Sequence, residues 1–193
     1  MSVTELTDNI KIQLSIFDRV GIGTADRFAD LESENHPDKY MPDLKSVIVF
    51  AEGKSNTNVE SLGSFKNYIA TISAQANVIT LLKTQGYDSM VIDNKHHDIS
   101  LVRIGIEAGL GEISPVDSLV IKGLGLTATL GAIITNAPLT ADKKVNEVCI
   151  NCNKCLRVCP IREIANAKGD LNKCACGACV YQCPVKDESE TKL

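Results

Sequence analysis

Apolar residues recur along the chain at spacings that predict an opening helix, a buried strand and a long second helix. Residues 3–19 place apolar side chains mostly four positions apart, which indicates an amphipathic helix, and Ser2 and Glu5 have the spacing of a capping box. Residues 44–51 are a β-branched apolar run of strand length, which is typical of a buried strand. Residues 59–85 repeat apolar side chains at steps of three and four, and this pattern predicts the longest helix.

Shorter elements follow, and a glycine pair separates the first helix from the first strand. Residues 20–25 form a short strand or a turn, and we favour a turn. They contain Gly21 and Gly23 but lack the third glycine of a dinucleotide-binding fingerprint, so we expect no phosphate-binding loop there. Asp98 is the predicted N-cap of a helix that Gly109 ends. In chain order, the further predicted elements are a strand at 89–93, a helix at 98–108 and strands at 118–122 and 130–135. This alternation indicates a layered core of helices on one sheet, of α/β or α+β class, without fixing the strand order.

All eight cysteines lie in the last quarter of the chain, in two runs. The first run has the spacing C-x2-C-x2-C-x3-C-P of bacterial ferredoxins, in which the fourth cysteine is a ligand of the neighbouring cluster. We therefore predict two 4Fe-4S clusters with crossed ligands. The first would be held by Cys149, Cys152, Cys155 and Cys183, and the second by Cys159, Cys174, Cys176 and Cys179.

The second run departs from this spacing at its first ligand. A regular x2 step would place that ligand at Lys173, but the chain has Cys174 followed by Cys176. The short step serves if Cys174 approaches the cluster from an incoming strand. Two other arrangements use the same residues, namely a pair of zinc sites or four disulfides in a secreted domain.

Composition and charge bear on partners and location. Hydrophobic residues make up 44% of the chain and aromatic residues only 4%, which is typical of a core of aliphatic side chains. The formal net charge of -4 provides no basic face to neutralise phosphates, so we expect no nucleic-acid partner. The chain begins with polar and acidic residues and has no apolar stretch of about 18 residues, so we expect no membrane segment. We expect a cytoplasmic protein, because thiols stay reduced there.

The position of the cysteines divides the 193 residues into a core and a small module. We expect an α/β core at residues 1–145, a ferredoxin-like domain with two clusters at 146–187, and a charged tail at 188–193. The module is poor in large apolar side chains, so its cohesion would come from metal–ligand bonds.

Three segments of the core, followed by the first cysteine run, resemble a known family. Residues 44–50, 98–111 and 130–139 resemble, in order and spacing, the epoxyqueuosine reductase and reductive dehalogenase superfamily, and the resemblance covers roughly residues 20–187. It implies an α+β fold, with a nitroreductase-like core of α/β-type layering and a small C-terminal bacterial-ferredoxin-like domain. In the family, the two clusters of that domain pass electrons to a cobalamin held on the core. The sequence ends at Leu193, a few residues beyond the last predicted ligand, so we expect it to lack the C-terminal helical-repeat part of epoxyqueuosine reductases.

The resemblance also suggests residues for the chemistry of the core. Asp93 and Asp98 both lie near the expected place of the acidic proton donor of the family reductases. Gly109, Gly111 and Ser118 are candidates for binding a cofactor in a pocket near residues 109–118. Cobalamin is the cofactor that the family suggests, and flavin is the generic alternative for this type of core.

Two functions remain open. In the first, the clusters pass electrons to a cofactor or substrate site on the core, as in an iron–sulfur reductase that acts on a small molecule. In the second, the chain is a non-enzymatic electron carrier or redox adaptor that docks a partner protein. Departures from the family pattern at residues 112–117 and 127–129 disfavour the first function. The size of the core disfavours the second, because ferredoxin modules carry electrons alone.

Overall fold

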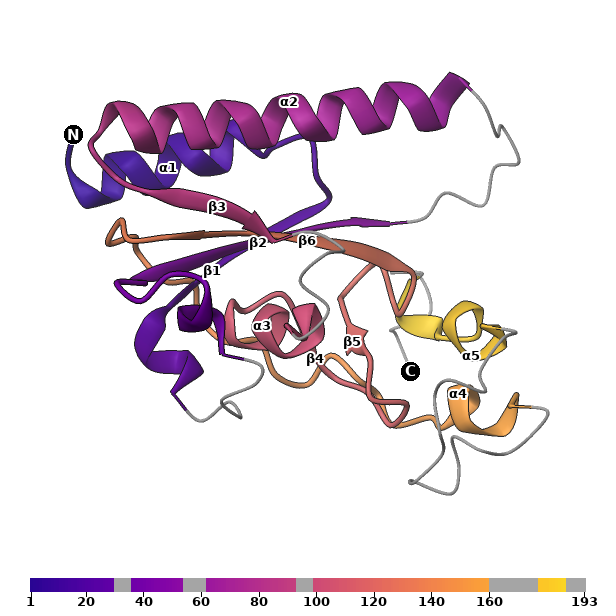
Figure 1. The fold of residues 1–193 in the computed structure, drawn as a ribbon. Coiled ribbons are helices and arrows are strands. Elements are labelled where there is room, and N and C mark those ends of the chain that lie inside the picture. The colour runs from indigo at the N-terminus through magenta and orange to yellow at the C-terminus, as the bar shows by residue number, and fades with distance from the viewer. Residues whose placement is uncertain (30–35, 54–61, 93–98, 160–176, 187–193) are drawn as a thin grey trace. The chain divides into compact units, whose positions relative to one another are not determined.

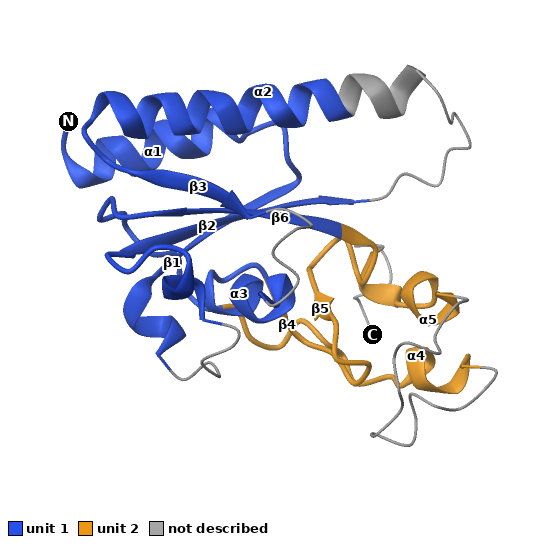
Figure 2. Cartoon of the chain, viewed as in Figure 1, with its two compact units in different colours: residues 1–110, 129–144 blue, residues 111–128, 145–193 orange. Residues whose placement is uncertain are grey.

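The chain forms two compact units, shown in blue and orange in Figure 2. Unit 1 consists of Met1–Leu110 and Thr129–Lys144, and unit 2 consists of Gly111–Ala128 and Val145–Leu193. The computed structural model describes residues 1–29, 36–53, 62–92, 99–159 and 177–186, and of residues 62–67 the backbone alone.

Unit 1 is built on a four-stranded sheet with the strand order β1-β2-β6-β3. Its strands are β1 (Arg19–Thr24), β2 (Ser46–Gly53), β3 (Ser89–Ile92) and β6 (Ala128–Thr135). β1 pairs antiparallel with β2, and β3 pairs antiparallel with β6. The strand that comes last in the sequence therefore lies inside the sheet. The strands predicted at 44–51, 89–93 and 130–135 are confirmed as β2, β3 and β6.

Helices cover both faces of this sheet (Figure 1). α1 (Val3–Gln13) and α2 (Leu62–Thr84) lie on one side of the sheet, and α3 (Leu101–Glu107) lies on the other. Two short 3-10 helices, η1 (Ala25–Phe28) and η3 (Pro37–Lys39), follow β1 and precede β2. Within the part of the chain that is described, no helix is both long and apolar enough to cross a membrane.

The opening helix has the predicted capping box but is shorter than predicted. The Glu5 N–H donates to Ser2 Oγ at 3.2 Å, and the Ser2 N–H donates to Glu5 Oε2 at 2.7 Å, which satisfies two amides at the helix start. The pattern predicted a helix over 3–19, but α1 ends at Gln13. Beyond it, the chain turns so that Phe17 stacks on Phe50 of β2, with ring centroids 4.4 Å apart. The helix therefore ends before the apolar pattern does, because Phe17 leaves the helix to pack in the core.

Of the two alternatives for residues 20–25, the strand is correct and the favoured turn was wrong, because residues 20–24 belong to β1 and Ala25 begins η1. A Cβ at Gly21 would collide with the carbonyl oxygen of Ala108, just beyond α3, and a Cβ at Gly23 would lie 2.8 Å from the Phe28 ring. The glycines therefore allow close packing against a strand, as glycine in a strand interior often does.

The start of α3 differs from the prediction, whereas its end agrees. The N-cap is Ser100, whose Oγ accepts the Arg103 N–H at 3.4 Å, and the predicted cap, Asp98, lies outside the described residues. Gly109 follows the helix with a φ of 80°, a left-handed conformation that suits glycine at a helix end.

The hydrophobic core of unit 1 joins α1 and α2 to the sheet. The buried residues of this core are Leu6, Ile10, Leu14, Phe17, Ile22, Ile48, Phe50, Ala74, Val78, Leu82, Ile133, Ala137 and Leu139. Aliphatic side chains dominate it, as the composition suggested. Gly131 of β6 lies directly against the Phe50 ring, where a Cβ would collide.

Unit 2 combines a short hairpin with the cysteine segments. β4 (Glu112–Ile113) pairs antiparallel with β5 (Leu119–Val120). The helical elements in the described part of unit 2 are α4 (Lys154–Arg157), α5 (Ala178–Tyr181) and η6 (Pro184–Lys186). The strand expected at 118–122 is reduced to β5, after which Ile121 forms an isolated bridge to Gly125. The expected domain boundary assigned residues 111–128 to the core, whereas these residues group with the C-terminal segments.

Candidate metal centre

Cysteines from two distant segments line one cavity in unit 2. Cys149, Cys152 and Cys155 lie in and before α4, and Cys183 lies immediately before η6. The empty volume of the cavity is about 330 Å³, part of which opens to solvent. The remaining lining residues are Ser114, Pro115, Val120, Leu126, Ile150, Asn153, Pro184 and Val185. The structure thus brings together the four residues of the first predicted ligand set.

The two cysteine segments share one local conformation. Asn153, with a φ of 56°, precedes α4, and Gly177, with a φ of 59°, precedes α5. Glycine adopts this left-handed conformation readily, and asparagine and aspartate adopt it occasionally. Each such residue is followed two positions later by a buried cysteine, Cys155 in α4 and Cys179 in α5. From Cys152 and from Cys176 onward, the two cysteine runs have the same spacing in the sequence. This shared spacing corresponds to the same left-handed residue followed by a short helix, α4 in the first run and α5 in the second.

The segment 111–128 helps to position Cys183, and the sequence motifs did not indicate this role. The Gly123 N–H donates to Val185 O at 3.1 Å. Gly125 has a φ of 60°, and a Cβ there would lie 3.3 Å from the Cys183 Cβ. At the other end of the segment, the Val148 N–H donates to a Glu112 carboxylate oxygen at 2.8 Å.

Apolar packing surrounds the four thiols. The buried cluster of unit 2 contains Val116, Val120, Leu126, Val148, Cys155, Cys179, Cys183 and Val185. Such a shell limits the access of water and lowers the local dielectric, and both affect the properties of a bound metal centre.

Burial and mutual proximity disfavour the ionised thiols. Burial is the main cause that raises the pKa of the Cys155 thiol, and the charges of Cys149 and Cys152 raise it further. The pKa of Cys183 is raised first by burial and then by Cys149, Cys152 and Cys155. A positive centre among these soft ligands would reverse the balance, because metal binding stabilises thiolates. The chemistry of these donors therefore suits an iron–sulfur cluster.

Single-ion binding has stricter distance requirements than cluster binding. Among the described residues, no group of three or more His, Cys, Asp or Glu side chains is arranged to hold a metal ion. With Zn–S bonds of 2.3 Å in a tetrahedron, thiolates would stand about 3.8 Å apart. A cubane puts its own iron and sulfide between its ligands, so this finding concerns a single ion and not a cluster.

The second predicted ligand set is only partly described. Cys159 and Cys179 are both buried. Cys174 and Cys176 lie outside the described residues, as do the candidate proton donors Asp93 and Asp98. The second cluster stays a prediction.

The three residues suggested for cofactor binding have packing roles in the structure. A Cβ at Gly109 would collide with the carbonyl oxygen of Lys143, and one at Gly111 would collide with that of Val120. The Ser118 N–H donates to Ser114 Oγ at 3.3 Å and closes the turn between β4 and β5. Ser114 and Pro115 of the predicted pocket region line the cysteine cavity. A cofactor-binding role for Gly109, Gly111 and Ser118 stays a prediction.

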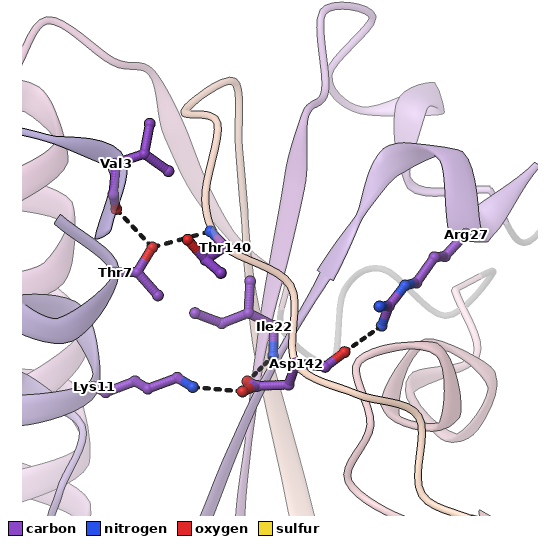
Figure 3. A network of polar contacts seen from close by, with 7 residues as sticks. All are labelled: Val3, Thr7, Lys11, Ile22, Arg27, Thr140 and Asp142. Carbon is purple, nitrogen blue, oxygen red and sulfur yellow. Dashed lines mark hydrogen bonds and ion pairs between the residues drawn. The ribbon is translucent and has the colours of Figure 1, made fainter. Parts of the chain in front are cut away.

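The segment that leads to the first cysteine run is fastened to unit 1 (Figure 3). Thr7 Oγ1 donates to Val3 O at 2.8 Å and accepts the Thr140 N–H at 3.0 Å. One carboxylate oxygen of Asp142 lies 2.5 Å from Lys11 Nζ, and the other accepts the Ile22 N–H at 3.0 Å.

Two further contacts hold the same segment. The Asp142 carbonyl oxygen accepts a hydrogen bond of 2.6 Å from Arg27 Nη1, and Lys144 forms an ion pair with Glu107. Residues 140–144 are therefore a bound strap of unit 1 and not a free linker.

No family model matches the chain, but individual proteins do. The chain is 32% identical over 114 residues to the tetrachloroethene reductive dehalogenase of Sulfurospirillum multivorans, and this match covers 43% of the present chain and 23% of the dehalogenase. The chain is also 25% identical over 207 residues to the epoxyqueuosine reductase of Bacillus subtilis, and this match covers 96% of the present chain and 53% of the reductase. The chain thus spans about a quarter and about half of the length of these two curated relatives.

Solved structures of both kinds share the fold. The structure of the Bacillus subtilis epoxyqueuosine reductase matches 97% of this chain and 67% of its own with a TM-score of 0.74 at 17% identity. A catabolic reductive dehalogenase matches 97% of this chain and 33% of its own with a TM-score of 0.74 at 22% identity. The resemblance to the epoxyqueuosine reductase and reductive dehalogenase superfamily is confirmed. The predicted α+β fold class is confirmed with it.

Two further structural neighbours concern ligands. One reductive dehalogenase structure concerns B12-dependent dehalogenation, and one epoxyqueuosine reductase was solved with a modified tRNA stem loop. These ligands belong to those proteins. The expectation that the present chain has no nucleic-acid partner stays a prediction.

Proposed function

We propose that the chain is an iron–sulfur redox protein of reductase type. One observation carries the proposal: Cys183, from the second cysteine run, lines the same cavity as Cys149, Cys152 and Cys155. This combination is the crossed ligand set of a ferredoxin with two cubanes. The relatives named as reductases and dehalogenases support the same type of chemistry.

In this proposal the four cysteines hold one 4Fe-4S cluster, which supplies one-electron transfer when bound. Asn151 and Asn153, both in the left-handed conformation, shape the loop around Cys152. Val120 and Leu126 limit the access of water to the cavity. The second cluster would be held by Cys159, Cys174, Cys176 and Cys179.

The electrons would leave for a cofactor or substrate site on unit 1. Cobalamin is the acceptor that the B12-dependent neighbour supports, and flavin is the alternative for this type of core. A small-molecule substrate or a redox partner protein suits a chain with a net charge of -4 better than a tRNA, whose phosphates need basic residues. A cytoplasmic location would keep the cysteines reduced.

Metal analysis of the whole chain, purified without oxygen, tests the proposal. We expect about eight iron and about eight sulfide per chain, as two cubanes require. Cys183→Ser should reduce the iron content to about four per chain and affect the same cluster as Cys152→Ser, although it lies in the other run. The matched variant Cys179→Ser should affect the other cluster, as seen by paramagnetic resonance of the reduced protein.

Two outcomes would change the conclusion. Zinc without sulfide would contradict the cluster proposal. If the chain carries clusters but binds neither cobalamin nor flavin at micromolar concentration, and a partner protein reoxidises it, the function is that of a carrier and not of a reductase.

A further inference from the structure

Among the described residues, the lining of the cysteine cavity reaches the surface at Pro115 and at the segment that begins at Ile150. Ile150 lines the cavity and is 49% exposed. Asn153 also lines it and is exposed, and Cys149 and Cys152 are both partly exposed. We call the exposed residues of this segment the 150–157 patch; its members are Ile150, Asn151, Asn153, Lys154 and Arg157.

The patch is positively charged within an acidic chain. Lys154 and Arg157 are exposed and three positions apart on α4, so their side chains lie on the same side of the helix. Arg157 Nη2 donates to Cys152 O at 2.8 Å, which holds one positive charge at the loop that lines the cavity. The sequence has no carboxylate from Cys149 to Cys159, whereas the whole chain carries a net charge of -4.

We propose that the 150–157 patch docks a small acidic electron-carrier protein that reduces the cluster. This inference rests on the proposed function, since it needs a cluster in the cavity. One electron passes from the reduced flavin or iron–sulfur centre of the carrier to the cluster, which oxidises the carrier by one electron. No bond forms or breaks in this step.

The patch has the composition that such an encounter requires. An apolar contact at the centre excludes water, and charges at the rim steer the partner and fix its orientation. Ile150 supplies the apolar contact, and Lys154 and Arg157 supply the charges. Docking here brings the carrier to exposed residues of the cavity lining, next to the four cysteines.

The charge count favours an acidic protein over a nucleic acid. Proteins that bind nucleic acids tightly neutralise about six to ten phosphates. The patch offers two cations, a number that suits steering between proteins, where association rates rise by about 10- to 1,000-fold.

The test measures how fast the cluster-loaded full chain is reduced. Reduced plant-type 2Fe-2S ferredoxin, an acidic protein, serves as the probe, and photoreduced deazariboflavin, which is uncharged, serves as the reference reductant. Lys154→Glu should lower the second-order rate constant with ferredoxin about tenfold at low ionic strength. The difference should vanish near 1 M salt, where the Debye length is about 3 Å.

Matched variants separate docking from other effects. Lys83→Glu changes the same charge in the last turn of α2 and should leave the rate unchanged, and Lys154→Arg should retain the rate of the parent chain. Deazariboflavin should reduce the clusters of all variants equally fast.

The outcomes distinguish this inference from the function on which it rests. Absence of a cluster overturns both. If deazariboflavin reduces the cluster while ferredoxin reduces it at a rate independent of salt and of residue 154, or does not reduce it, the docking proposal alone is wrong. Equal losses in Lys83→Glu and Lys154→Glu would show an effect of overall charge and would also contradict it.

Discussion

Removing the Asp142 carboxylate tests whether the strap stabilises unit 1. In Asp142→Ala, the Ile22 N–H loses its side-chain acceptor at 3.0 Å, and Lys11 loses its ionic partner. The backbone contacts of residue 142 remain: its N–H donates to Ile22 O at 2.8 Å, and its carbonyl accepts from Arg27 at 2.6 Å. The substitution therefore isolates the contribution of the carboxylate.

The two losses differ in size. A partly buried amide without a partner costs about 1–3 kcal/mol. The side chains of Lys11 and Asp142 are 37% and 31% exposed, so their ion pair contributes only about 0.2–1 kcal/mol. We expect Asp142→Ala to reduce the free energy of unfolding by about 2 kcal/mol. Asp142→Asn and Lys11→Met should each reduce it by less than about 1 kcal/mol, because both variants retain an acceptor for the Ile22 N–H.

Hydrogen exchange of the β2 amides measures this free energy within unit 1, since the substitution removes none of their hydrogen bonds. A loss of about 2 kcal/mol accelerates exchange about thirtyfold where exchange requires opening of the unit. Denaturant unfolding of the full chain gives a second measurement. If Asp142→Asn costs as much as Asp142→Ala, the charge and not the amide acceptor dominates, and the reasoning is refuted.

Two further predictions concern other contacts of unit 1. Gly131→Ala should destabilise the unit by about 1–3 kcal/mol, because its Cβ would collide with the Phe50 ring. In denaturant unfolding, adding Phe50→Leu to this variant should recover part of the loss. If the free-energy losses of the two substitutions simply add in the double variant, the clash is contradicted. Hydrogen bonding to the Ser2 backbone lowers the pKa of Glu5. The ionised Glu5 side chain therefore stabilises α1 fully above the ordinary pKa of a glutamate, and this stabilisation is lost as the pH falls through the lowered pKa of Glu5. Glu5→Gln retains the capping geometry without the titration, so exchange of the α1 amides should lose this pH dependence; an unchanged dependence would rule out Glu5 as its source.

The sequence predicted which cysteines lie together at one cavity better than it predicted the rest of the cavity lining. The ligand spacing is local, so the grouping of Cys183 with the first run followed from the motif alone. Ser114, Pro115, Val120 and Leu126 also line the cavity, and long-range packing, which leaves no periodic signal in the sequence, brings them there. Residues 111–128 were for that reason assigned to the core.

Small residues caused the errors in the core. Gly21 and Gly23 are typical of turns, but in β1 they allow the chain after α3 to approach the strand, a requirement that only the tertiary structure reveals. Asp98 and Ser100 are both favourable N-caps, and propensity cannot choose between two such residues at neighbouring positions.

The position of β6 has a consequence for synthesis of the chain. β6 lies between β2 and β3 but is translated after both, so each of these strands first has an unpaired edge. At about 5–20 residues per second, the 43 residues from 93 to 135 take roughly 2–9 s to add. During that interval the nascent chain exposes two strand edges to aggregation, and the first cysteine run begins only 14 positions after Thr135. Closure of the sheet and emergence of the cysteines from the ribosome therefore fall within the same few seconds.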